Sequence, residues 1–99
     1  MNWKNLERKV AESLGGERVS RGADFGESAP DVEHDVFSVE CKYRKNISKF
    51  LHESLKQAQG YDDGKIPIVV LKEKMQRGEY VLMKFDDFVK VWRGDTDGE

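Results

Sequence analysis

The chain has 99 residues, of which 37% are apolar, and a formal charge of −2. This size favours one domain with one small core, and two Trp, five Phe and three Tyr argue against a disordered chain. The negative charge does not favour a nucleic-acid binder of the usual basic kind. The charges are clustered, however. Carboxylates crowd residues 24–35 and 95–99, and basic side chains crowd residues 4–9, 18–21 and 42–49.

The sequence contains no feature typical of a secreted or membrane protein. Cys41 is the only cysteine, so an internal disulfide is excluded. The first nine residues are charged and lack the apolar stretch of a signal peptide. No segment approaches the roughly 20 apolar residues that a membrane span requires. We therefore expect a soluble, cytoplasmic protein.

The first third of the chain predicts one helix and two short strands. A helix is predicted over residues 2–14, where apolar side chains recur at helical spacing before a Gly-Gly pair. A strand is predicted over residues 17–20, followed by a loop over residues 21–29 with two Gly and little periodicity. Pro30 then opens a second strand, a position at which proline is tolerated. The apolar stripe of the helix consists of Trp3, Leu6, Val10 and Leu14.

Residues 36–43 alternate in polarity, which predicts a third strand with two different faces. If this strand and the one after Pro30 form a hairpin that turns at His34-Asp35, Asp31 faces Ser38 and lies diagonal to Glu40. One face of the third strand then carries Phe37, Val39, Cys41 and Tyr43, and the other carries Ser38, Glu40 and Lys42.

The second half of the chain predicts two helices around a strand pair. An amphipathic helix is predicted from Asn46 or Ser48 to about Tyr61. The nearly all-apolar residues 66–71 predict a strand that is covered on both faces. Its partner strand is predicted over residues 79–85 and a short final helix over residues 86–92.

These elements give the order α-β-β-β-α-β-β-α. This order predicts an α/β fold in which a central mixed sheet is flanked by helices. Because neither a linker nor a repeat interrupts the sequence, residues 1–94 are expected to form a single domain. The acidic tail 95–99 is expected to fray.

The predicted hairpin places Asp31, Glu40 and Lys42 on one face. Diagonal neighbours on a sheet lie roughly 7–8 Å apart, close enough for two carboxylates to share a cation. Two such carboxylates repel each other, and a hard divalent ion relieves that repulsion. An ammonium group beside them can polarise a water molecule or stabilise charge on a phosphate. The alternative is that all three side chains are ordinary solvated strand residues.

This pattern, Pro30-Asp31 followed by Glu40-Cys41-Lys42, resembles the signature of the PD-(D/E)XK nuclease superfamily. Within it the chain is most similar to the small archaeal and phage Holliday-junction resolvases, over about residues 5–71. In those proteins a helix with a glutamate precedes the signature, and an Arg-bearing strand leads into a Gly/Ser-rich loop. The loop of this chain is more acidic than that pattern.

The resemblance implies a restriction-endonuclease-like fold with a central mixed five-stranded sheet. It implies a Mg²⁺-dependent endodeoxyribonuclease, for which Mn²⁺ substitutes, in which Asp31 and Glu40 bind the metal and Lys42 assists the attacking water. It also implies a homodimer that cuts four-way or other branched DNA. Two alternatives stay open: another nuclease of the superfamily, of nicking or restriction type, and a catalytically silent DNA-binding module.

Further residues are candidates for the same site. The predicted first helix turns Glu7 towards the core, where a carboxylate is costly unless it is bound to metal or paired with a base such as Arg18 or Lys42. The resemblance places a helix glutamate at the metal, and it gives Gln57 an accessory position that an ordinary surface glutamine would also occupy. The candidate phosphate contacts are Arg18, Arg21, Arg44, Lys45 and Lys49. Ser38 is a further accessory candidate, whereas His34 is interpreted as a turn residue and Cys41 as a core residue.

Overall fold

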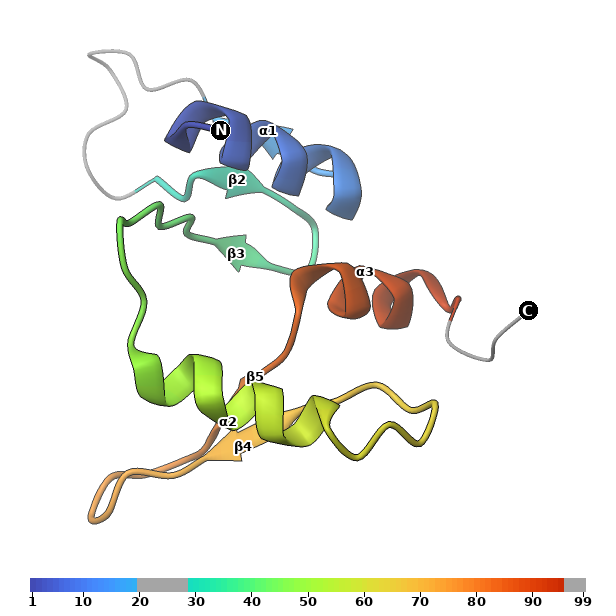
Figure 1. Ribbon diagram of the computed structural model, residues 1–99. Helices are drawn as coiled ribbons and strands as arrows, with labels where there is room; N and C mark the ends of the chain where they lie inside the picture. Colours follow the sequence, from blue (N-terminus) through green and yellow to red (C-terminus); the bar gives the residue numbers. More distant parts are fainter. Residues whose placement is uncertain (20–28, 96–99) are drawn as a thin grey trace. The chain divides into compact units, whose positions relative to one another are not determined.

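The computed structural model describes residues 1–19 and 29–95, and these form two compact units that divide between Lys45 and Asn46. The observed order of elements is α-β-β-β-α-β-β-α (Figure 1), as the sequence predicts. The expectation of a single domain stays a prediction. Within the described residues, no helix combines the length and the apolar composition of a membrane span.

The first unit contains one helix and a three-stranded antiparallel sheet of order β1-β2-β3. Helix α1 packs against β1 and β2 (Figure 1). The central strand carries Val32, which is fully buried. The elements are α1 (Trp3–Leu14), β1 (Glu17–Arg18), β2 (Val32–Glu33) and β3 (Ser38–Val39).

The ends of α1 follow from local side-chain and backbone chemistry. The Asn2 side chain caps the first turn by accepting the Asn5 N–H at 2.9 Å. Gly15 ends the helix in the left-handed conformation, at φ 78°, and its N–H bonds back to the Ala11 carbonyl. The buried apolar side chains of the helix, Val10, Ala11 and Leu14, lie in its C-terminal half, and α1 contacts β1 and β2.

His34 joins the end of α1 to the β2–β3 turn. Its Nε2–H donates to the Leu14 carbonyl at 2.8 Å, and its Nδ1 accepts the Val36 N–H at 3.0 Å. Its ring also lies against Phe37, with the centroids 5.0 Å apart. The interpretation of His34 as a turn residue is therefore confirmed, and the same side chain sets where the helix meets the hairpin.

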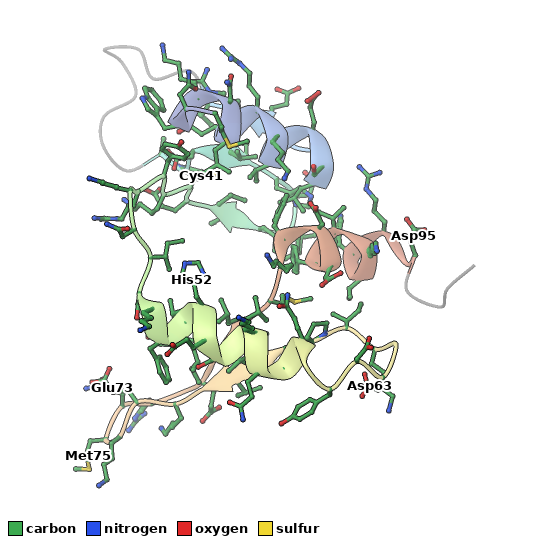
Figure 2. The ribbon with its side chains drawn as sticks, viewed as in Figure 1. Cys41, His52, Asp63, Glu73, Met75 and Asp95 are labelled. Atoms are coloured by element: carbon green, nitrogen blue, oxygen red, sulfur yellow. The ribbon has the colours of Figure 1, made fainter. Side chains whose placement is uncertain are left out.

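The second unit contains α2 (Lys49–Gln59), the antiparallel pair β4 (Val69–Leu71) and β5 (Tyr80–Leu82), and α3 (Phe85–Arg93). Helix α2 packs on β4. The prediction that residues 66–71 are covered on both faces is wrong, because Val70 is 60% exposed. The loop between β4 and β5 projects Met75 into solvent at its tip (Figure 2).

The expected central mixed sheet of five strands is not what the described residues form. Their strands make one three-stranded and one two-stranded sheet, both antiparallel. Each strand is only two or three residues long, so it has few backbone N–H and C=O groups to pair. The strand next to it in the sequence supplies hydrogen-bond partners for these groups. The coarser prediction of an α/β protein with helices beside sheets is confirmed.

Replacing Gly16 by Ala is expected to lower the free energy of unfolding by about 1–3 kcal/mol. A Cβ at this position would lie 2.3 Å from the Glu33 carbonyl oxygen and 3.1 Å from Val32 Cγ1, so β1 and β2 would have to separate. The matched control is Gly15→Ala, whose Cβ meets nothing within 4 Å and which costs only about 1 kcal/mol for its positive φ. Urea denaturation of both variants tests the difference. Equal losses would contradict the close approach.

Candidate active site

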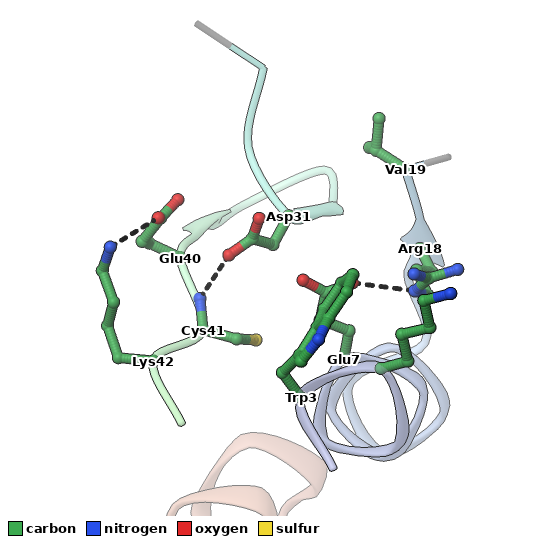
Figure 3. Close-up of a pocket in the computed structure, with 9 residues that line it drawn as sticks. Trp3, Glu7, Arg18, Val19, Asp31, Glu40, Cys41 and Lys42 are labelled. Atoms are coloured by element: carbon green, nitrogen blue, oxygen red, sulfur yellow. Dashed lines mark hydrogen bonds and ion pairs between the residues drawn. The ribbon is translucent and has the colours of Figure 1, made fainter. Parts of the chain in front are cut away.

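A pocket of about 530 Å³ opens in the first unit (Figure 3). It lies where the first turns of α1 meet β1 and the start of β2, with the segment after β3 along the other side. Its walls carry three carboxylates and three cationic groups, so their formal charges cancel. The pocket is lined by Trp3, Lys4, Glu7, Arg18, Val19, Asp31, Glu40, Cys41 and Lys42.

Asp31 is the most rigidly held of the three carboxylates. Its backbone N–H donates to the Val39 carbonyl at 2.8 Å, and its own carbonyl accepts the Val19 N–H at 3.0 Å. Its side-chain Oδ2 accepts the Cys41 N–H at 2.7 Å (Figure 3). The residue is only 4% exposed. The sheet on both sides therefore fixes the position of this carboxylate before any ligand binds.

The register of the hairpin differs from the prediction. Val32 pairs with Val39 and Glu33 with Ser38, so Asp31 comes opposite Glu40 rather than diagonal to it. A two-residue turn at His34-Asp35 would favour positive φ angles, which neither residue adopts, and the turn is longer instead. Because the difference is two residues, the faces are preserved. Ser38, two residues before Glu40 in the chain, does not line the pocket.

Glu40 and Lys42 form an ion pair at the mouth of the pocket. The Lys42 Nζ lies 3.2 Å from Glu40 Oε2, and both side chains are more than half exposed (Figure 3). A pair this exposed contributes at most about 1 kcal/mol. It therefore opposes only weakly the transfer of Glu40 to a metal ion or of Lys42 to a phosphate.

Glu7 projects from α1 into the pocket and is 7% exposed. The sequence leaves two roles open for Glu7, metal binding and pairing with a basic residue, and the structure shows the pairing. Arg18 Nε donates to Glu7 Oε1 at 2.8 Å (Figure 3). Arg18, expected as a phosphate contact, thus has its charge balanced inside the pocket. Metal binding by Glu7 stays a prediction.

The other predicted site residues lie on the segment after β3, in the second unit or outside the described residues. Arg44 and Lys45 are exposed on the segment that follows β3. Lys49 and Gln57 are exposed on α2 in the second unit, where Lys49 lies 3.8 Å from Glu53. Arg21 falls outside the described residues. The structure therefore assembles the signature residues, Glu7 and Arg18, and leaves the remaining phosphate contacts as predictions.

Four residues of the pocket wall were not expected at the site. Trp3 was predicted to face the core, but it is 53% exposed. Lys4 and Val19 had no predicted role at the site, and Cys41 is half-buried in the pocket wall rather than in the core. A sequence signal for Trp3 exists: it precedes Glu7 by four residues, so both share one side of the helix. A helix side that carries a carboxylate among apolar residues is as consistent with a pocket wall as with a core.

The negative charge of the pocket affects the pKa of the Cys41 thiol. Burial raises the pKa of this thiol, and the carboxylates of Asp31, Glu7 and Glu40 raise it further. The three carboxylates come from α1, from the start of β2 and from the end of β3, yet all act on one sulfur atom. Their charges therefore converge in the pocket.

The alkylation of Cys41 by iodoacetamide is expected to be slower in the folded protein than in the urea-unfolded chain at mildly alkaline pH. The folded thiol has the higher pKa, so the unfolded chain loses this proton first. By the same linkage, this group lowers the stability of the fold as the pH rises from the unfolded towards the folded pKa. Asp31→Asn removes one cause and should bring the folded pKa closer to the unfolded one. An unchanged pH profile in that variant would contradict the convergence of charge at Cys41.

The donor set suits a hard divalent ion that also binds water and substrate. Within residues 1–19 and 29–95, no three Asp, Glu, His or Cys side chains form a group that could hold a metal ion by themselves. Mg²⁺, however, is commonly bound by one or two carboxylates, with water and phosphate oxygens completing its octahedron. Asp31 and Glu40, opposite each other at the end of the hairpin, fit that requirement.

Comparison with known proteins finds no match for this chain among family models, curated proteins or solved structures.

Proposed function

We propose that the protein is a Mg²⁺-dependent DNA endonuclease of the PD-(D/E)XK type, with its active site in this pocket. The observation that carries the proposal is that Asp31, Glu40 and Lys42 line one pocket although Asp31 comes just before β2 and the other two follow β3. An E-x-K pattern alone is common on solvated strands. A buried, rigidly hydrogen-bonded carboxylate opposite that pattern is what metal-assisted hydrolysis needs, and it supports the proposal.

In this proposal each signature residue has one task. Asp31 and Glu40 would hold the ion, Asp31 as the ligand fixed by its hydrogen bonds and Glu40 as the one that would leave its pair with Lys42. Lys42 then has its ammonium group available to orient the attacking water or to stabilise charge on the phosphate. A bound Mg²⁺ would supply Lewis acidity to the phosphate and lower the pKa of a bound water. Glu7 is a further candidate ligand, provided that it leaves Arg18.

The charge balance of the pocket supports a phosphate substrate. The three carboxylates alone would repel a phosphodiester, but three cations from α1, β1 and the segment after β3 offset them. A divalent ion at the carboxylates would then make the pocket positive. Cation binding and DNA binding should therefore strengthen each other.

We extend the proposal to branched DNA, cut by a homodimer with a restriction-endonuclease-like fold, on the strength of the resemblance alone. Two symmetric cuts across a four-way junction require two sites. The exposed apolar side chains of the second unit, such as Val81 and Trp92, supply surface that a second copy could cover.

Cleavage of three labelled substrates tests both levels of the proposal: a four-way junction, a linear duplex of the same sequence and a single strand. We expect cleavage with Mg²⁺ or Mn²⁺, no cleavage with a chelator, and preference for the junction. Equal cutting of all three would remove the junction specificity and leave a nuclease of another type. The absence of cleavage with either metal would contradict the proposed activity.

One observation favours a catalytically silent DNA-binding module instead. Glu7 and Glu40 each have a basic partner within the pocket, Arg18 and Lys42, so neither of these two carboxylates needs a metal for charge balance. Such a module would bind DNA with an affinity that Mg²⁺ leaves unchanged and would cut none of the three substrates. Under the nuclease proposal, the divalent ion should increase the affinity.

A further inference from the structure

Trp3 occupies an unusual place for a large apolar side chain. It lies in the first turn of α1, is 53% exposed and lines the same pocket as the acidic residues. Single exposed apolar side chains are ordinary on protein surfaces. An exposed indole in the wall of a charged pocket is less ordinary. A small side chain at this position would leave less apolar surface exposed to water.

Two cations lie close to the Trp3 ring. The Arg18 guanidinium carbon lies 5.9 Å from the ring centroid and the Lys4 Nζ lies 5.4 Å from it, both within the range of cation–π attraction. Arg18 is itself fixed by its hydrogen bond to Glu7. The Tyr43 hydroxyl adds a second restraint, since it donates to the Met1 carbonyl at 2.8 Å just before the helix begins. The indole is therefore oriented before a ligand binds.

The Trp3 ring stands inside the pocket, between groups that line it. In Figure 3, Arg18 lies on one side of the indole, and Cys41 and Asp31 lie on the other. An aromatic face that is oriented and partly exposed, with cations nearby, is the combination by which proteins hold single-stranded nucleic acid. The bases stack on the ring while the cations follow the backbone. Lys4, Arg18 and Lys42 are the cations that line this pocket.

We propose that Trp3 stacks on an unpaired nucleobase beside the acidic residues, so that the pocket binds a DNA strand at a point where a base has left the duplex. This inference rests on the proposed nuclease function and specifies its substrate. A base inside a regular duplex already stacks on its neighbours and presents no free face. A fork, a single strand or a branch point that carries unpaired bases does present one, whereas a four-way junction presents one only where a base pair at its centre opens.

Binding without cleavage tests this inference. Fluorescein-labelled single strands, forked duplexes and blunt duplexes of matched sequence are titrated with the protein in a chelator, and anisotropy is followed. Trp3→Ala is expected to weaken binding to the single strand and the fork by about 5- to 150-fold, with little change for the blunt duplex. Trp3→Phe, which keeps an aromatic ring, should retain most of the affinity. Tyr61→Ala, at an exposed aromatic residue of the second unit, is the matched control.

Tryptophan emission gives a second readout. In a Trp92→Phe background, Trp3 is the one remaining tryptophan, and its fluorescence should be quenched by unlabelled single strands and much less by duplex. Equal loss of affinity for all three DNAs in Trp3→Ala, or no loss for any, would overturn the inference. A protein that binds through Trp3 but cuts nothing with Mg²⁺ would retain the inference and lose the nuclease proposal. Cleavage with unchanged binding by Trp3→Ala would do the reverse.

Discussion

Replacing Asp31 by Asn is expected to lower the rate of Mg²⁺-dependent DNA cleavage by about a hundred- to a thousandfold. The amide has the shape of the carboxylate, and its oxygen can still accept the Cys41 N–H, so the local fold should survive. It lacks the negative charge that holds a divalent ion, however. Initial rates on a labelled four-way junction, together with circular dichroism spectra of both proteins, separate the loss of chemistry from a loss of structure.

Asp35→Asn is the matched control for this prediction. It makes the same chemical change on an exposed residue of the β2–β3 turn that does not line the pocket, so cleavage should be unaffected. Calorimetric titration with Mn²⁺ adds a readout that does not depend on DNA: the wild type should bind the ion and Asp31→Asn should bind it more weakly. Full cleavage by Asp31→Asn would place the active site elsewhere.

The sequence predicted those parts of the fold that depend on local chemistry. The order of elements and the approximate bounds of the three helices follow from apolar periodicity and, for α1, from the Gly-Gly pair at its end, where Gly15 is left-handed. Strand lengths were overestimated, since alternation over residues 36–43 describes side-chain direction and not hydrogen bonding. Only Ser38 and Val39 of that segment belong to a strand. The number of strands in each sheet depends on pairing between distant segments, on which local patterns carry no information.

In the candidate site, too, local patterns predict some features, whereas others depend on contacts between distant segments. Alternation places Glu40 and Lys42 on one face, and no change of register by an even number of residues alters this. Which residue lies opposite Asp31 depends on the length of the turn, and the bonds of His34 determine that length. The partner of Glu7 depends on how α1 lies over β1. The sequence could name Arg18 only as one of two candidates.

The second large effect concerns the buried ion pair between Glu7 and Arg18. Arg18→Met is expected to lower the free energy of unfolding by about 2–4 kcal/mol, because it leaves the Glu7 carboxylate buried without its partner. The value lies towards the lower end of the range for broken buried pairs, since the Arg18 side chain is 26% exposed. Urea denaturation followed by circular dichroism measures the loss. Methionine keeps the length of the arginine stem, so the packing against Trp3 is disturbed as little as possible.

The double variant Glu7→Gln/Arg18→Met separates a lost ion pair from lost packing. If the unpaired charge is the main cost, the double variant should be more stable than Arg18→Met alone, although it carries one change more. If packing is the main cost, the two losses should add.

Mg²⁺ then tests whether Glu7 can serve the metal as well as the base. Without Arg18, the Glu7 carboxylate no longer accepts the hydrogen bond from the Arg18 Nε, so a metal ion in the pocket gains a ligand. Millimolar Mg²⁺ should therefore stabilise Arg18→Met more than the wild type, because the stabilisation by a ligand grows with the logarithm of its affinity for the native state. The double variant should lose that extra stabilisation. Equal stabilisation of all three proteins would leave Glu7 as the structural partner of Arg18 and confine the metal to Asp31 and Glu40.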